Sequence, residues 1–142
     1  MSKAEKDIAL AKIAKGQSVV SIGKSKFRIG SYIVHVRFCS TNVRAPEKYK
    51  FNINPNTLSA DYELWVCGSA SVHYLMPISF MQSIYQNPNT YVDRMHPEIR
   101  VVSVDIDSHM VTYASGGVKS SLRGYLGSNS RSLEKLCTIN VL

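Results

Sequence analysis

Residues 31–40 read SYIVHVRFCS, and this segment constrains the fold more than any other. The apolar residues Val34 and Val36 alternate with His35 and Arg37, a period of two that predicts a β-strand. Such a strand buries one row of side chains and places His35 next to Arg37 on the other row. Two interpretations of the pair stay open: a functional site, or the solvent-facing side of an edge strand.

Further strands are predicted where apolar residues alternate between turn signals. They are expected at residues 17–23, 49–53, 60–68, 72–77, 99–107 and from 110 onward. The last two of these strands are expected to form a hairpin that turns near Asp107 and Ser108. Residues 24–30 are expected to be a turn or a strand, and residues 115–121 a turn. Helices are predicted from Ser2 to Gly16, where Ser2 and Glu5 match a capping box, and over 77–87, where Pro77 begins a segment with helical apolar spacing. A short helix is also expected around 133–137.

This order of elements predicts an α/β or α+β fold with a mixed central sheet flanked by helices. With 142 residues, 44% of them hydrophobic, residues 1–142 suit a single domain. No segment approaches the roughly 20 apolar residues of a membrane helix, and the first residues are charged where a signal peptide would be apolar. We therefore expect a soluble, cytoplasmic protein with no membrane partner. The widely spaced Cys39, Cys67 and Cys137 are expected to be core thiols.

The positive charge is concentrated in the first third of the chain. Residues 1–50 hold eleven Lys or Arg against three acidic residues, a balance of +8, whereas residues 51–142 hold six against seven, a balance of −1. This asymmetry favours an anionic partner, most simply a nucleic-acid backbone, because neutralising phosphates releases counterions. A surface charge that only promotes solubility is the alternative.

Residues 28–80 resemble the PD-(D/E)XK nuclease superfamily, which has the restriction-endonuclease-like fold. The resemblance lies in four segments in order: YIVHVRF, KYKFNI, ADYELWVCG and HYLMPISFM. In many members, a strand ending in an acidic residue or Gln, any residue, then Lys is followed by an aromatic-rich strand, a strand opening with an Ala-Asp-Tyr-like step, and a short strand ending in Pro before a helix. The resemblance implies this fold and a metal-dependent endonuclease ancestry.

The family's metal-binding motif falls on His35 and Arg37 in this chain. Mg²⁺ prefers oxygen ligands, so histidine is a poor replacement for the acidic residue, and arginine cannot act as a base. The family also requires an Asp on the preceding strand, and no Asp or Glu occurs at residues 8–46. Asp61 and Glu63 remain as candidate carboxylates. The resemblance thus implies a degenerate motif with no metal site and no cofactor, or Mg²⁺ or Mn²⁺ if the protein is active as a nuclease.

We therefore predict a DNA-binding protein on a degenerate nuclease-like fold, and we favour a protein without enzymatic activity over an enzyme. Phosphates of double-stranded DNA are expected to contact Lys24, Lys26, Arg28, Arg37, Arg44, Lys48 and Lys50. Two alternatives stay open. One is an active Mg²⁺- or Mn²⁺-dependent endonuclease that uses Asp61 and Glu63. The other is a protein-interaction subunit of a DNA-processing complex, working as a homodimer or with a larger protein partner.

Overall fold

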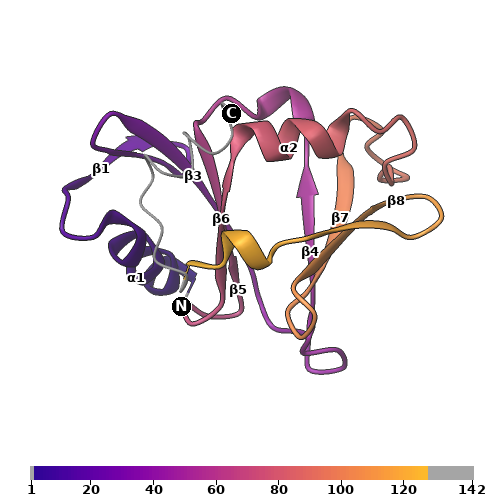
Figure 1. Cartoon of the computed structure of the whole chain (residues 1–142), viewed down its shortest axis with the longest axis horizontal. Helices are drawn as coiled ribbons and strands as arrows, with labels where there is room; N and C mark the ends of the chain where they lie inside the picture. The colour runs from indigo at the N-terminus through magenta and orange to yellow at the C-terminus, as the bar shows by residue number, and fades with distance from the viewer. Residues whose placement is uncertain (1, 128–142) are drawn as a thin grey trace.

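The computed structural model describes residues 2–127, which form two α-helices, two short 3-10 helices and nine strands (Figure 1). Their bounds are α1 Ser2–Ala14, β1 Val19–Gly23, β2 Lys26–Ile29, β3 Tyr32–Cys39, β4 Lys48–Ile53, η1 Pro55–Thr57, β5 Tyr62–Cys67, β6 His73–Pro77, α2 Ile78–Tyr85, β7 Arg100–Asp105, β8 Met110–Ala114, β9 Val118–Ser121 and η2 Arg123–Tyr125. The two longer predicted helices are confirmed. The short helix expected around 133–137 lies outside the described residues.

Five strands form a mixed sheet, called sheet A here, in the order β1-β2-β3-β5-β6. β3 and β5 are parallel, and the other neighbours are antiparallel. Every residue of β5 and β6 is buried. The reason is that sheet A has packing partners on both faces, which is also why these two strands read as nearly continuous apolar runs.

Four strands form an antiparallel sheet, called sheet B, in the order β4-β7-β8-β9. β4 and β9 are its two edges. Along β4 the residues alternate between exposed and buried, with Lys48, Lys50 and Asn52 on the exposed row and Tyr49 and Phe51 on the buried row. This alternation is typical of a strand with one solvated face.

The predicted mixed sheet flanked by helices is present as sheet A, but four further strands form the separate sheet B, which was not expected. β3 pairs with β5 rather than with β4, its neighbour in sequence, and β4 pairs with β7. Alternation along a strand shows which side chains are buried but not which strand lies alongside. One local prediction is wrong, because residues 118–121 form β9 instead of a turn. Of the two alternatives for residues 24–30, a turn or a strand, the structure has the strand β2. The coarser prediction of a mixed α/β or α+β architecture is confirmed.

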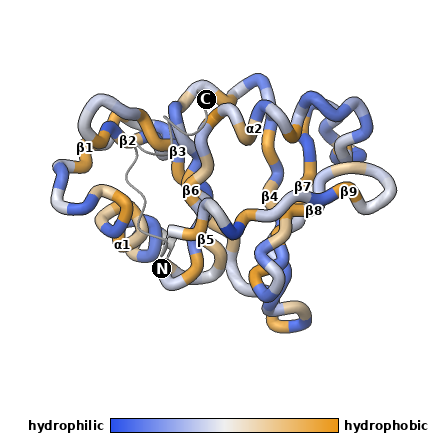
Figure 2. The backbone as a smooth tube through the Cα atoms, in the orientation of Figure 1, coloured by the Kyte–Doolittle hydropathy of each residue, from blue (hydrophilic) through white to orange (hydrophobic). Residues whose placement is uncertain are grey.

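Two hydrophobic cores lie on opposite faces of sheet A. The first joins α1 to sheet A and includes Leu10, Val36 and Leu64. The second fills the space between sheet A, sheet B and α2, where the ring of Phe51 stacks on Trp65 with centroids 4.6 Å apart. Figure 2 shows hydrophobic residues concentrated in the strands that cross the middle of the molecule. The layers are therefore α1, sheet A, and then sheet B together with α2 (Figure 1).

Neither α-helix of residues 2–127 has the length and hydropathy required to cross a membrane.

Candidate functional site

His35 and Arg37 lie together on the face of β3 that is turned towards sheet B. Both are largely buried, with side chains 16% and 18% exposed. The carboxylate of Glu63 on the neighbouring β5 binds both of them. The Nδ1 atom of His35 lies 3.0 Å from Oε2 of Glu63, and Nε of Arg37 donates a 2.7 Å hydrogen bond to Oε1. The parallel register explains the contact, because it places His35 directly opposite Glu63.

Glu63 is a charged residue at the base of this cluster and is only 1% exposed. Burial by itself would raise the pKa of its carboxyl group. The hydrogen bond to His35 and the charge of Arg37 outweigh burial, so the pKa of Glu63 is lowered. The indole Nε1 of Trp65 also donates to Oε1, at 3.4 Å. Glu63 is therefore an ionised carboxylate that holds His35 and Arg37 in fixed positions.

A hollow of about 540 Å³, called the β3–β4 groove here, opens beside this pair. Its lining residues are Lys6 of α1, Ser25 of the β1–β2 turn, His35, Val36, Arg37 and Phe38 of β3, and Lys50, Phe51 and Asn52 of β4. None of these lining residues is acidic. The described lining thus combines three basic side chains with a histidine, and the buried Glu63 lies behind them.

The groove exists because β3 is longer than its pairing with β2. The register of β2 against β3 ends where Lys26 lies opposite His35. One step further, the N–H of Val36 donates to the carbonyl of Ser25 at 2.9 Å, and β3 then continues to Cys39. Because alternate N–H groups of a strand point the same way, the N–H of Phe38 is directed to the same side as that of Val36. This side of β3 borders the groove.

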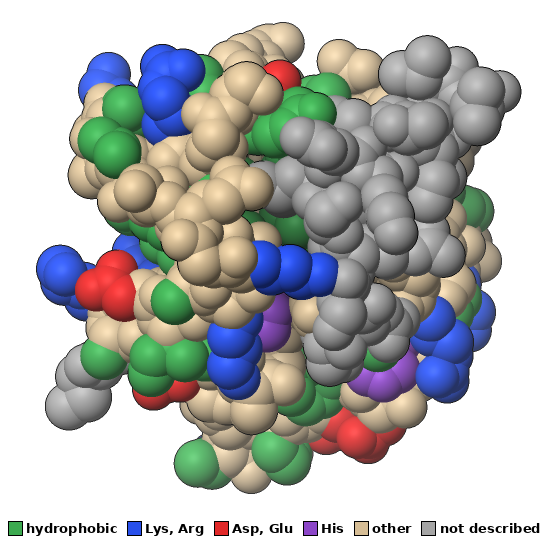
Figure 3. Space-filling model, turned by 60° about the vertical axis from the view of Figure 1, so that its left-hand side comes forward, with side chains coloured by type: hydrophobic (Ala, Val, Ile, Leu, Met, Phe, Trp, Pro, Cys, Tyr) green, Lys and Arg blue, Asp and Glu red, His purple; other side chains and the backbone are tan. Residues whose placement is uncertain are grey.

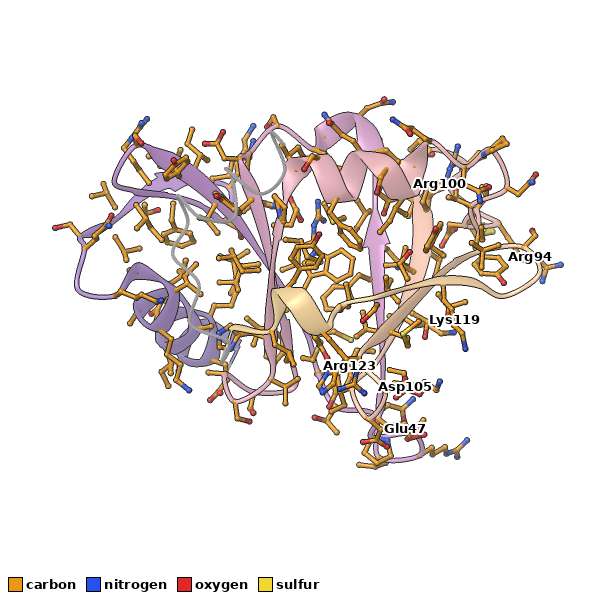
Figure 4. All side chains as sticks on the ribbon, viewed as in Figure 1. Glu47, Arg94, Arg100, Asp105, Lys119 and Arg123 are labelled. Carbon is orange, nitrogen blue, oxygen red and sulfur yellow. The ribbon has the colours of Figure 1, made fainter. Side chains whose placement is uncertain are left out.

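The predicted DNA-contacting residues do not all lie at the groove. Arg37 and Lys50 line it. Lys26 donates a 2.6 Å hydrogen bond to Ser59, and Lys48 forms a 2.8 Å ion pair with Asp105, which lies beside Glu47 at one end of sheet B (Figure 4). The three others are exposed: Lys24 in the β1–β2 turn, Arg28 on β2 and Arg44 in the loop 40–47.

Asp61 and Glu63, the candidate carboxylates, have different environments. Asp61 comes just before β5, is exposed, and accepts a 2.8 Å hydrogen bond from the N–H of Ile33. Glu63 is bonded to His35 and Arg37 through both oxygens. Within residues 2–127, no three His, Cys, Asp or Glu side chains gather as a metal site would require.

The sequence interpretation missed one residue of the groove lining and one buried tyrosine that is close enough to feel the charge of Arg37. Lys6 reaches the groove because of how α1 packs on sheet A, and no local pattern marks it. Tyr85 of α2 was expected only as part of an apolar stripe. Its hydroxyl is buried without a hydrogen-bond partner among the described residues, and burial raises its pKa while the nearby charge of Arg37 opposes that effect. The only sequence signal for the buried hydroxyl of Tyr85 is the presence of a tyrosine in an apolar helical stripe.

One edge of sheet A carries exposed apolar side chains. Val19, Val20 and Ile22 of the edge strand β1 are 36%, 53% and 44% exposed. An edge strand has unpaired backbone groups, so an apolar edge of this kind can pair with another chain.

No protein-family model, curated protein or solved structure matches the chain.

Proposed function

We propose that this protein binds the phosphate backbone of double-stranded DNA in the β3–β4 groove. The observation that carries the proposal is the charge of the described lining, in which Lys6, Arg37 and Lys50 surround a hollow without an acidic wall. Together with the buried Glu63, these groups sum to a local balance of three positive charges against one negative charge. A site of this kind attracts phosphates and favours counterion release.

Arg37 is the central phosphate ligand in this proposal. A guanidinium has five N–H donors in a planar fork, and Arg37 donates to Glu63 through Nε. The terminal nitrogens can then bind two oxygens of one phosphate. Because Glu63 already fixes the orientation of the guanidinium, less side-chain entropy is lost on binding. The N–H of Phe38 supplies a neutral donor at the same side of β3.

We further propose that the scaffold is a restriction-endonuclease-like fold whose metal site has degenerated. This proposal is supported by the resemblance of residues 28–80 and by the position of His35 and Arg37 at the floor of a basic groove. In such a protein the acidic residue that would hold Mg²⁺ has been replaced by His35, which is bonded to Glu63. The proposed function is therefore binding without catalysis.

The test is the affinity of the protein for labelled duplex DNA of several unrelated sequences, measured by fluorescence anisotropy over a range of salt concentrations. We expect affinity to fall steeply with salt and to depend little on sequence. Lys50→Ala should weaken binding and reduce the slope of log K against log salt by about one, because one phosphate contact is lost.

A matched control is available at the other edge of sheet B. Lys119 of β9 is also exposed (Figure 4) but does not line the groove, so Lys119→Ala should change affinity much less than Lys50→Ala. Figure 3 shows Lys and Arg side chains at several places on one face of the molecule. The comparison of the two variants therefore separates binding in the groove from general attraction to a basic surface. Equal losses in the two variants would contradict a localised groove, and affinity independent of salt would contradict phosphate binding.

The exposed apolar edge of β1 favours a second candidate function, which is association with a second copy of the chain. An edge strand can pair with its own copy in an antiparallel, two-fold symmetric arrangement that needs no other component. Sedimentation equilibrium should then show a dimer at high concentration. Val20→Lys should shift the population to monomer, because a charge would be placed against the same charge of the partner.

A further inference from the structure

Cys39 and Cys67 are the last residues of two adjacent strands and lie directly opposite each other. Cys39 ends β3, Cys67 ends β5, and the parallel register pairs them. Both side chains are on the same face of sheet A. Cys39 follows Arg37 by two residues and Cys67 follows Trp65 by two residues, so both point towards the core between the two sheets. Both are free thiols.

The spacing of neighbouring strands suits a covalent link between them. Adjacent strands lie about 4.8 Å apart, and disulfides form between Cα atoms that are roughly 4.4–6.8 Å apart. The Sγ atom of Cys39 now donates to the carbonyl oxygen of Ser40 at 3.6 Å, and a disulfide would replace this contact. Both cysteines stand at strand ends, and Cys67 is followed by Gly68 with a φ of +77°. The backbone therefore leaves the sheet at this point.

The two thiols differ in accessibility. Cys39 is partly exposed, whereas Cys67 is 2% exposed within the core. Burial raises the pKa of the Cys67 thiol, and the neighbouring Cys39 raises it further. Cys67 is therefore protonated and shielded, and Cys39 is the thiol that a reagent in solution meets first. This is the arrangement of an attacking cysteine and a resolving cysteine.

We propose that Cys39 and Cys67 form a thiol pair that a hydroperoxide oxidises to an intramolecular disulfide. In the first step, the thiolate sulfur of Cys39 attacks one peroxide oxygen and the O–O bond breaks. Cys39 becomes a sulfenic acid, and the other oxygen takes up the proton that the Cys39 thiol released and leaves as an alcohol, or as water when the oxidant is hydrogen peroxide. In the second step, the sulfur of Cys67 displaces the sulfenic oxygen. The S–S bond forms, and the Cys67 proton leaves with that oxygen as water. The two thiols lose two electrons and the peroxide gains them.

The disulfide would join β3 to β5 at the end of the β3–β4 groove, two residues beyond Arg37. This inference does not depend on the proposed DNA binding, because its evidence is the register and burial of the two cysteines.

The experiment is peptide mapping of the full-length protein after treatment with hydrogen peroxide and blocking of the remaining thiols under denaturing conditions. Arg44, Lys48 and Lys50 separate the two cysteines, so trypsin places Cys39 in 38–44, Cys67 in 51–94 and Cys137 in 136–142. We expect a linked species of 38–44 with 51–94 that a reducing agent converts to the two separate peptides. Cys137→Ser should give the same linked species.

The control is Cys67→Ser, which keeps the size of the side chain and removes the resolving thiol. In this variant, oxidation should stop at a sulfenic acid on Cys39, which a dimedone-type reagent traps. Three results would overturn the proposal: Cys39 and Cys67 both alkylated after peroxide treatment, Cys39 oxidised to sulfinic acid while Cys67 remains a thiol, or linkage only between different molecules. The mapping of the unsubstituted protein decides the matter even if a variant fails to fold.

Discussion

Arg37 donates a 2.7 Å hydrogen bond through Nε to a carboxylate oxygen of Glu63 that is almost completely buried. The two residues come from parallel strands that are separated by a whole strand in the sequence. This contact fixes the arginine at the floor of the groove and keeps an ionised acid inside the protein. A buried charge of this kind is stable only while its partners stay in place.

Replacing Glu63 with Gln should destabilise the protein strongly. The variant keeps the shape of the side chain but leaves Arg37 without its counter-charge, and breaking a largely buried ion pair costs roughly 3 kcal/mol. Urea denaturation should show this loss in the free energy of unfolding. As a control, Glu98→Gln removes a carboxylate that is 52% exposed and should change stability by less than about 0.5 kcal/mol. Similar effects for both variants would argue against the buried ion pair.

Stability should decrease as the pH falls below about 4.5, the ordinary pKa of a glutamic acid. The pKa of Glu63 is lower in the folded protein than in the unfolded chain, so its contribution is fully present above 4.5 and is lost as the pH falls through the folded pKa. Asp105 acts in the same direction at lower pH, because the hydrogen bond from Lys48 lowers its pKa to about 2. The urea midpoint, measured at several pH values in this range, should fall less steeply with decreasing pH in Glu63→Gln than in the unsubstituted protein.

The stacked rings of Phe51 and Trp65 join the two sheets, so Phe51→Ala should lower the free energy of unfolding by about 3–5 kcal/mol. Trp65 is the only tryptophan in the chain, and its fluorescence therefore reports directly on this contact. We expect a red shift of the emission in the folded variant, because water gains access to the indole. Val43→Ala, at a side chain that is 91% exposed, should leave both stability and emission unchanged.

Supercoiled plasmid DNA should remain intact in the presence of the protein and Mg²⁺ or Mn²⁺. The reason is that His35 and Arg37 occupy both oxygens of Glu63, while Asp61 accepts a hydrogen bond from the backbone of Ile33. Agarose gel electrophoresis measures nicking directly. Metal-dependent cleavage that disappears in Asp61→Asn would instead support the endonuclease alternative.

Local patterns in the sequence were sufficient to predict most of the secondary structure. The alternation in residues 31–40 predicts β3, and Pro77 with the following apolar spacing predicts α2. These features depend on neighbours along the chain, and a sequence displays them directly. β9 was missed because VKSS has little apolar content and forms an exposed edge.

The candidate site could be predicted only in part. The alternation on β3 accounts for His35 and Arg37 sharing a face, but it carries no information on the partner of that face. Glu63 reaches them only because β3 pairs with β5 instead of β4, and Lys6 reaches the groove only because α1 packs on sheet A. Both contacts join residues that are far apart in sequence, so no spacing rule reports them.

The path of the chain between β3 and β5 has a consequence for how the protein folds. Residues 40–61 leave sheet A, supply the edge strand of sheet B and then return to complete the central parallel pair. A break at any one place in the chain would therefore fail to separate the strands of sheet A from the strands of sheet B. The two sheets should unfold in one cooperative transition, and refolding should be slow for a chain of this size, because the parallel pair forms only after this long loop has closed.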